Sequence, residues 1–387
     1  MLPPDFEDNH SSIVIQKGNI KMKKINRIIS IILTAAIGFT AAGCAGGNQS
    51  SGTGTATKAA AQASEETKNT EENTAEELKT IRIGAPAADA SQLVENAGAA
   101  KSYGFLEEEL AKAGYKAEYI GFGQGGTAVN EALASGQLDA AFVGDIPTII
   151  ARGNGLDIVA AASLNSSAEM GLLAGPGKEF KEVADLKGKN IAALFGTVTY
   201  VYLVNLLGSE GVGIDEVNII NDLANAATLI ATGDADALIS TGAGLYQFEG
   251  AGLGSIAFSS RNNPDQSSQF YFYGNRSYFE ENPEAVKAVI KALIRSKDKA
   301  SEDPDSLYKA LDLPERPAAL VEKIYPRENG FEYFEPYLTQ SIAAKYESTA
   351  KILLDSGIVT TQVNAADFFD TKYLDEVYKE LGRAIPS

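Results

Sequence analysis

The sequence predicts an α/β fold of two lobes, each built on a doubly wound, mostly parallel β-sheet. The chain has 387 residues, which is longer than one typical domain. From Leu78 onward, short apolar runs rich in β-branched residues alternate with stretches of helical periodicity, as in parallel βαβ architectures. The composition, 44% hydrophobic and 22% charged, is that of a globular protein.

The N-terminal part predicts a secretory signal peptide over residues 22–43. Met22 is followed by three basic residues and by the apolar run 28–39, which is shorter than the ~20 residues of a membrane-spanning helix. Small residues then precede Cys44. This ending resembles a bacterial lipobox, with Ala41 in place of the usual Leu, and the resemblance implies a lipid on Cys44. The alternative is an ordinary secretory signal with a chance Cys.

The segments on either side of the signal peptide have separate expectations. Residues 1–21 fit no secretory signal, so we expect the true start at Met22. Residues 44–77 are rich in Gly, Ser, Thr, Ala, Gln and Glu and predict a flexible linker of roughly 30 Å, part of which could be helical. Together these features predict an extracytoplasmic protein anchored to the cell membrane by its N-terminal lipid.

The folded part predicts strands that end in Gly-containing loops and helices between them. The helix over 91–114 is expected to be interrupted near Gly104, and another is expected to begin near Pro147. The expected strands are 80–87, 117–122, 138–145, 157–166, 170–176, 190–196, 217–222, 235–241 and 269–275. The other expected helices are 127–136, 199–208, 226–234, 283–300 and 334–357.

The order of these elements predicts two lobes joined by two crossings of the chain. The first lobe is expected to comprise residues 78–166 plus 261–387, and the second lobe residues 167–260. Asn165 and Ser166 lie at the expected first crossing, so each belongs either to a hinge or to a binding site.

Composition excludes several classes of function. A net charge of −18 argues against nucleic acid, because phosphate backbones require Lys and Arg. The one His is His10 and the one Cys is Cys44, so cleavage before Cys44 would leave no His, no disulfide and no thiol nucleophile. We therefore expect a monomer that is not an enzyme, without a cofactor and without a metal.

Three stretches carry a resemblance to a known family. They are EALASGQLDAAFVGDIPTIIARGNGLDIVAAAS, VADLKGKNIAALFGTVTYVYLVNLL and ATGDADALIST. They resemble the aliphatic sulfonate, taurine and nitrate group of ABC solute-binding proteins. The resemblance implies the type II periplasmic-binding-protein fold, a small-molecule solute, and a membrane permease with its ATPase as partners. It departs from the sulfonate pattern in STGAGLYQFEG, where a Trp-Asp-Pro cluster is usual, and in APAADASQ, where Tyr-Gln is often found.

Small and hydroxylated residues lie where strands are expected to meet helix N-termini. In open α/β sheets ligands bind at the carboxyl ends of strands, and helix N-termini favour anions. Two such turns facing each other could hold an oxyanion without an Arg. The alternative is that each turn only caps its helix. The candidate ligand-binding residues are Gln124, Gly125, Gly126, Thr127, Gly144, Asp145, Asn165, Gly196, Thr197, Thr199, Tyr200, Thr241 and Gly242.

Some of these residues have an equally ordinary interpretation. Asp145 either accepts a hydrogen bond from a ligand or caps the following helix. Tyr200 either covers an apolar part of the ligand or packs in the core. Tyr271 and Tyr273 alternate on a strand, and for them packing is the preferred interpretation.

The sequence thus predicts capture of a small anion, sulfonate-like or nitrate-like, by closure of two lobes. A neutral solute such as a thiamine-precursor pyrimidine is the alternative within the binding class. An enzyme on the same fold that acts on a small pyrimidine, and a sensor subunit that presents its ligand to a receptor, are the alternatives from other classes.

Overall fold

The computed structural model describes residues 77–87, 89, 93 and 95–386. The predicted signal peptide, Cys44 and all of the predicted linker except Glu77 lie outside these residues. No helix in the described part of the chain is both long enough and apolar enough to cross a membrane.

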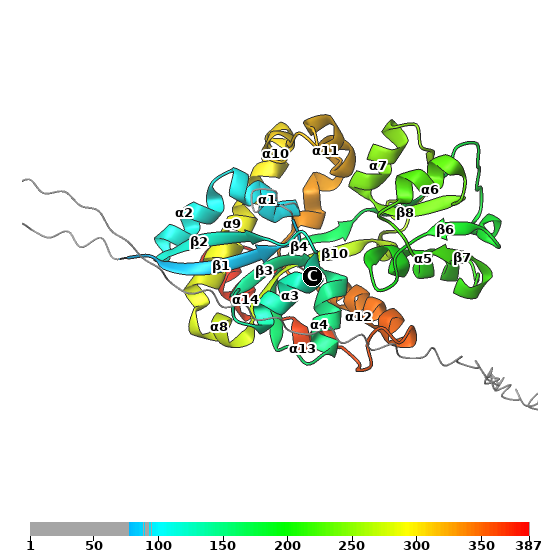
Figure 1. The fold of residues 1–387 in the computed structure, drawn as a ribbon. Helices are drawn as coiled ribbons and strands as arrows, with labels where there is room; N and C mark the ends of the chain where they lie inside the picture. Colours follow the sequence, from blue (N-terminus) through cyan, green and yellow to red (C-terminus); the bar gives the residue numbers. More distant parts are fainter. Residues whose placement is uncertain (1–76, 88, 90–92, 94, 387) are drawn as a thin grey trace, which may run out of the picture. The chain divides into compact units, whose positions relative to one another are not determined.

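Two five-stranded sheets organise the described chain (Figure 1). The first has the order β2-β1-β3-β10-β4 and the second the order β7-β6-β8-β5-β9. In each sheet four strands run in one direction, because β10 and β5 are antiparallel to both of their neighbours. The two-lobed α/β prediction is confirmed, and we call the lobes built on these sheets lobe I and lobe II.

Lobe I contains the first and last parts of the described chain. Its strands are β1 (Lys79–Ala85), β2 (Tyr115–Gly121), β3 (Ala140–Gly144), β4 (Ile158–Ala168) and β10 (Ser268–Asn275). Its helices are α1 (Glu95–Ser102), α2 (Phe105–Lys112), α3 (Gly126–Ala134), α4 (Asp145–Gly153), α8 (Arg276–Glu281), α9 (Pro283–Glu302), α10 (Pro304–Ala310), α11 (Ala318–Ile324), α12 (Gln340–Asp355), α13 (Ala365–Phe368) and α14 (Lys372–Glu380).

Lobe II is inserted between β4 and β10. Its strands are β5 (Met170–Ala174), β6 (Asn190–Ala192), β7 (Asn218–Ile220), β8 (Ala237–Thr241) and β9 (Ser255–Ser259). Its α-helices are α5 (Val198–Gly208), α6 (Ala226–Thr232) and α7 (Gly242–Gly250). Strand β9 and helix α7 were not predicted.

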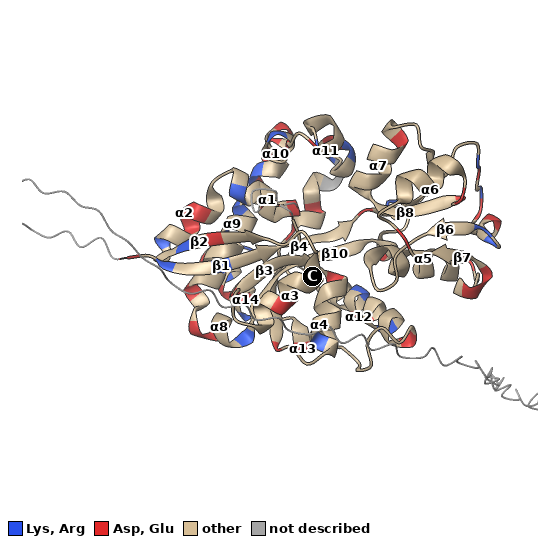
Figure 2. Ribbon diagram, viewed as in Figure 1, with Lys and Arg blue, Asp and Glu red and all other residues tan. Residues whose placement is uncertain are grey.

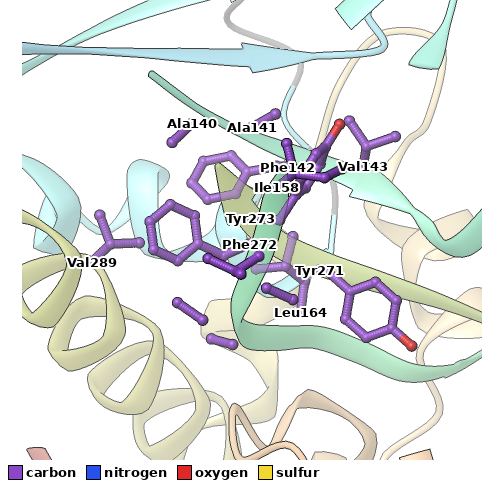
Figure 3. Close-up of a cluster of buried hydrophobic side chains, with 14 of the residues drawn as sticks. Ala140, Ala141, Phe142, Val143, Ile158, Leu164, Tyr271, Phe272, Tyr273 and Val289 are labelled. Carbon is purple, nitrogen blue, oxygen red and sulfur yellow. The ribbon is translucent and has the colours of Figure 1, made fainter. Parts of the chain in front are cut away.

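The core of lobe I lies around β10, whose side chains pack on both faces of the sheet (Figure 3). Tyr271, Phe272 and Tyr273 are fully buried there, so the preferred packing interpretation of the two tyrosines is confirmed. Both hydroxyls find partners, since Tyr271 donates to Gln269 Oε1 at 2.5 Å and Tyr273 to Asn130 Oδ1 at 2.6 Å. Helix α9, which begins at Pro283, covers the sheet with an apolar face that includes Val289.

Helix breaks follow the glycines and the capping residues. Gly104 adopts a left-handed conformation (φ 76°) directly before α2, which accounts for the predicted interruption. The prediction that a helix begins near Pro147 is confirmed, since α4 begins at Asp145 and Pro147 lies in its first turn. Proline fits any position in the first turn, since the N–H groups there have no helical partner.

The chain crosses between the sheets twice. Only Glu169 separates β4 from β5, and residues 260–267 lead from β9 back to β10. The crossings are joined by a hydrogen bond between the hydroxyls of Ser167 and Ser267, at 2.9 Å, and by one from the Met170 amide to Ser260 Oγ, at 3.0 Å. Lys and Arg occur with Asp and Glu on the helices of lobe I, whereas α5, α6 and α7 of lobe II carry a single charged residue, Glu249 (Figure 2).

Candidate functional site

A cavity of about 360 Å³ lies between the lobes. This volume equals that of roughly twelve water molecules and lies in the range of small-molecule sites. Both crossings contribute to its wall, together with the start of α7 from lobe II and the segment around α11 from lobe I. The lining residues are Glu95, Asn165, Ser167, Ala168, Glu169, Met170, Val198, Thr241, Gly242, Ala243, Ser260, Arg261, Pro264, Ser268, Phe270, Arg316, Ile324, Tyr325, Pro326 and Tyr333.

Arg316 lines this cavity and has donors that no described residue binds. Arg316 is only 8% exposed, yet neither its Nε nor its Nη2 has a hydrogen-bond partner among the described residues. These two nitrogens form one edge of the guanidinium, the edge that binds two oxygens of a carboxylate or a similar oxyanion side by side. Because a buried charge without a partner is costly, binding of an anion that accepts from these two donors would be favourable.

The second arginine, Arg261, is already paired. Its Nη2 lies 2.8 Å from Glu169 Oε2, and it also donates to the carbonyls of Ile324, at 3.0 Å, and of Lys323. Glu169 further accepts from the hydroxyls of Ser259, at 2.6 Å, and Tyr246, at 3.1 Å. This ion pair is saturated by protein groups, so it adds no net charge to the cavity.

Glu95 introduces a carboxyl group into the same cavity. Burial raises the pKa of Glu95, because loss of water disfavours the charged form, while hydrogen bonds from Asn165 and Tyr325 and the charge of Arg316 oppose the rise. The amide of Asn165 donates to Glu95 Oε2 at 2.6 Å. Arg316 and Glu95 thus bring a guanidinium and a carboxyl group to one cavity, beside the Arg261–Glu169 ion pair.

Aromatic rings form part of the apolar wall. Tyr325 is 3% exposed and stacks at 6.3 Å on Tyr333, which belongs to the 3₁₀ segment Glu328–Phe334. Phe270 from β10 and Met170 from β5 lie on the same wall. The cavity therefore offers both a charged end and an apolar surface.

Three of the predicted ligand-binding residues line this cavity. Asn165 reaches it from β4, and Thr241 and Gly242 reach it from the junction of β8 and α7. The amide of Gly242 donates to the Glu169 carbonyl at 2.8 Å, so that donor is occupied. Thr241 precedes α7 without a side-chain cap bond, which leaves its hydroxyl available to the cavity.

The structure places the other predicted residues away from the cavity wall. Gln124, Gly125, Gly126 and Thr127 lie at the start of α3, where a Cβ on Gly126 would come within 2.5 Å of Pro147. Gly144 precedes α4. Gly196, Thr197, Thr199 and Tyr200 lie at the start of α5, and Val198 between them does line the cavity.

The hydroxyls at the start of α5 are used within the lobe. Thr197 Oγ1 donates to the Leu194 carbonyl at 2.7 Å and accepts from the Thr199 amide at 3.3 Å, as a helix cap. Thr199 Oγ1 accepts from the Leu194 amide at 3.0 Å. Tyr200 donates to Ser356 Oγ at 3.3 Å, which joins α5 to the residue after α12.

Asp145 is a buried carboxyl beside the crossings and not in the main cavity. It lines a separate space of about 10 Å³ and accepts from Ser268 Oγ at 2.9 Å and from the Ile146 amide at 2.9 Å. Burial raises the pKa of Asp145 to about 6, and these hydrogen bonds oppose the rise. It therefore links the start of α4 to β10.

The charged and aromatic residues of the cavity were not predicted. Arg261 follows the strand that ends at Ser259, and Arg316 lies between two prolines in LDLPERPAA. A charged residue in a proline-rich turn is only a weak indication of a binding site, since most such residues are exposed to solvent. Glu95 was placed inside a predicted helix, where nothing in the sequence distinguishes it from a solvated acid.

Comparison with known proteins agrees with this fold. A protein of Brucella abortus (strain 2308) named as a binding protein is 30% identical over 183 residues, which are 45% of this chain and 54% of that protein. This chain thus spans about half the length of that relative.

Solved structures extend the likeness over most of the chain. A periplasmic sulfonate-binding protein SsuA from Methylobacillus flagellatus KT has a TM-score of 0.71 and 24% identity, covering 81% of this chain and 99% of that chain. The periplasmic nitrate-binding protein NrtA from Synechocystis PCC 6803 has a TM-score of 0.60 and 17% identity, covering 80% and 92%. The desulfurization enzyme DszB has a TM-score of 0.61 and 14% identity, covering 78% and 99%.

These likenesses confirm the predicted resemblance at the level of the two-lobed fold. A family model described as NMT1/THI5 like matches residues 99–307, which is more than half of the chain. The chain therefore belongs to the NMT1/THI5-like family.

Proposed function

We propose that this protein is the solute-binding component of an ABC importer and captures a small organic or inorganic anion between its lobes. The observation that carries the proposal is the buried guanidinium edge of Arg316, Nε and Nη2, which no described protein group binds. A bidentate oxyanion would satisfy both donors and compensate the charge.

Capture by closure is supported by contacts between the lobes. Helix α7 of lobe II lies beside α11 of lobe I (Figure 1), and Gln247 Nε2 donates to the Glu315 carbonyl at 2.9 Å. A solute that touches both lobes favours the closed state by its differential affinity for it. The sulfonate-binding and nitrate-binding proteins with the same fold support this role.

The location and partners follow from the sequence. The signal-like segment 22–43 and Cys44 support secretion and lipid anchoring, and the linker 44–77 would let the lobes reach a membrane permease. Labelling with a radioactive fatty acid tests the anchor. Incorporation into the wild type but not into Cys44→Ser is expected.

Arg316→Gln tests the anion site. Removal of one partner of a buried ionic contact costs about 2 kcal/mol or more, so affinity for an anion should fall roughly 30-fold or more. Arg316→Lys keeps the charge but loses the paired donors, so it should also bind more weakly than the wild type. Arg327→Gln is the control, because Arg327 is 51% exposed, pairs with Asp305 and lies outside the cavity.

The anion itself is found by a thermal-shift screen of the purified protein against sulfonates, nitrate, taurine and pyrimidines, since a ligand stabilises the state that it binds. The expected result is stabilisation by an anion that Arg316→Gln abolishes. A response to pyrimidines alone, unaffected by Arg316→Gln, would contradict the proposal.

A neutral heteroaromatic solute is the second candidate. It is favoured by the stacked rings of Tyr325 and Tyr333 on the wall of the cavity. Catalysis is tested in the same samples. Chemical change of the solute during incubation would assign an enzyme, a role that DszB shows this fold to accommodate.

A further inference from the structure

Glu95 is an unexpected group in a cavity suited to an anion. It is 7% exposed and adopts a left-handed backbone conformation (φ 57°), which is uncommon for a residue other than glycine. Such conformations persist where the surrounding structure fixes them, and they cluster at functional sites. The backbone that carries this carboxyl group is therefore in a conformation that the surrounding structure has to maintain.

The carboxyl is oriented by neutral groups. Asn165 donates to its Oε2 at 2.6 Å, and Tyr325 is a further hydrogen-bonding neighbour. Arg316 is near enough for its charge to favour the carboxylate, yet Nε and Nη2 of Arg316 have no partner among the described residues. The two opposite charges thus line one cavity without forming an ion pair through that edge.

This arrangement constrains the solute. A carboxylate has about four acceptor positions, and Asn165 and Tyr325 use only part of them. An anion bound at Arg316 that has no donor would displace water from Glu95 without replacing its hydrogen bonds, and it would also repel the carboxylate. An ammonium group on the same solute removes both costs, and a hydroxyl group removes the first of them.

We propose that Glu95 is a specificity-determining residue that selects organic anions carrying an ammonium or hydroxyl group apart from their acidic end. The acidic end binds Arg316 and the donor binds Glu95, while the aromatic wall contacts the carbon chain between them. The proposal rests on the proposed function and narrows it. Inorganic anions such as nitrate have no donor and are discriminated against.

The discrimination follows the rule that a site with a buried hydrogen-bonding group rejects an analogue that leaves the group unpaired. It requires a cavity large enough for both ends of the solute. The volume of about 360 Å³ meets this requirement, since it lies in the range of cavities that bind small molecules.

Isothermal titration calorimetry with three isosteric anions tests the proposal. Propane-1-sulfonate, 2-hydroxyethanesulfonate and 2-aminoethanesulfonate differ only in a terminal methyl, hydroxyl or ammonium group. The wild type should bind the ammonium compound at least tenfold more tightly than the methyl compound, with the hydroxyl compound between them. The corresponding carboxylates, butyrate, 3-hydroxypropionate and 3-aminopropionate, should give the same order.

Glu95→Gln should reduce the tenfold preference to less than threefold while binding of propane-1-sulfonate is retained. Glu335→Gln is the matched control, because Glu335 is a largely buried carboxyl with a raised pKa that lies outside the cavity. It should keep the preference of the wild type. Circular dichroism and thermal unfolding establish that both variants are folded.

Each of the other outcomes shows whether the role of Glu95 or the proposed function is wrong. Equal binding of the three sulfonates by the wild type overturns the role of Glu95 and leaves the anion receptor intact. A preference that persists in Glu95→Gln assigns the donor to another group and also overturns it. If none of the six anions binds the wild type, the proposed function fails with it.

Discussion

The ammonium group of Lys345 lies 2.7 Å from the main-chain carbonyl oxygen of Ser166. The same ammonium donates to Ser267 Oγ at 2.6 Å and to the Pro264 carbonyl at 3.0 Å. Ser166 lies near the end of β4, just before the outgoing crossing, and the other two acceptors belong to the returning one. A single side chain of α12 therefore binds both connections between the lobes.

Lys345→Met should destabilise the protein by about 2 kcal/mol at pH 7, because three acceptors, of which Ser267 is buried, lose a charged donor. Burial lowers the pKa of Lys345 to about 8, so the group is still mainly charged at that pH. Urea unfolding followed by circular dichroism measures the change. Lys351→Met on the same helix is the control, since Lys351 is 68% exposed, and its effect should stay within about 0.5 kcal/mol.

Asp145 should make stability fall as pH rises from about 4 to about 6. Its pKa is raised from 3.8 to about 6 in the native state, so the native state binds its proton more tightly than the unfolded state does. The stabilisation is complete at the acid end of this window and is lost toward pH 6, with a gross amplitude of about 3 kcal/mol.

Asp145→Asn removes this titration. The free energy of unfolding, measured in urea at several pH values, should therefore fall between pH 4 and pH 6 in the wild type but not in the variant. The difference between variant and wild type should increase in favour of the variant over this range. Ser268→Ala is a second informative variant, because it deletes the hydroxyl whose hydrogen bond opposes the rise in the pKa of Asp145. A difference between Asp145→Asn and the wild type that is the same at all pH values would contradict the assignment.

Thr197→Val should lower stability and leave solute affinity unchanged. Its hydroxyl caps α5 and does not line the cavity, although the sequence had suggested that it binds the solute. Loss of a threonine cap costs about 1 kcal/mol. Thr197→Ser should retain the cap. Calorimetry with 2-aminoethanesulfonate should give a Kd within about twofold of the wild type, and a larger loss would return Thr197 to the binding site.

Gln247→Ala should weaken solute binding without removing any contact to the solute. Its amide bonds the Glu315 carbonyl across the gap between α7 and α11, so its loss favours the open state. A hydrogen bond worth about 1 kcal/mol corresponds to roughly a fivefold change in apparent affinity. Stopped-flow release of 2-aminoethanesulfonate should be faster. Gln362→Ala, at an exposed residue that does not line the cavity, should release it at the wild-type rate.

The alternation of strands and helices was predictable because it depends on local patterns. The buried strand at Ile81 and Ile83 and the glycine break at Gly104 are each encoded within a few residues. Helix α7 was missed because GAGLYQFEG contains three glycines, which lower helix propensity. Its packing against α11 and β5 supplies what the local sequence does not.

The binding cavity was only partly predictable. Strand ends and helix starts have local signatures, so Asn165, Thr241 and Gly242 could be proposed from sequence. Arg316 and Glu95 are separated by more than 200 residues, and each has an ordinary polar neighbourhood in the chain. Their juxtaposition results from the packing of α1 and the segment before α11, which no pattern in either segment indicates.

Strand β10 occupies the place between β3 and β4 in the sheet of lobe I. Strand β4 is hydrogen-bonded within the sheet only to β10, so it has no strand partner until β10 arrives. About a hundred residues separate the two strands, and they include all of lobe II. During synthesis lobe II therefore emerges complete while the sheet that holds its ends is unfinished. The order of translation thus favours early folding of the inserted lobe, with completion of the outer lobe as the late, slow event of long-range pairing.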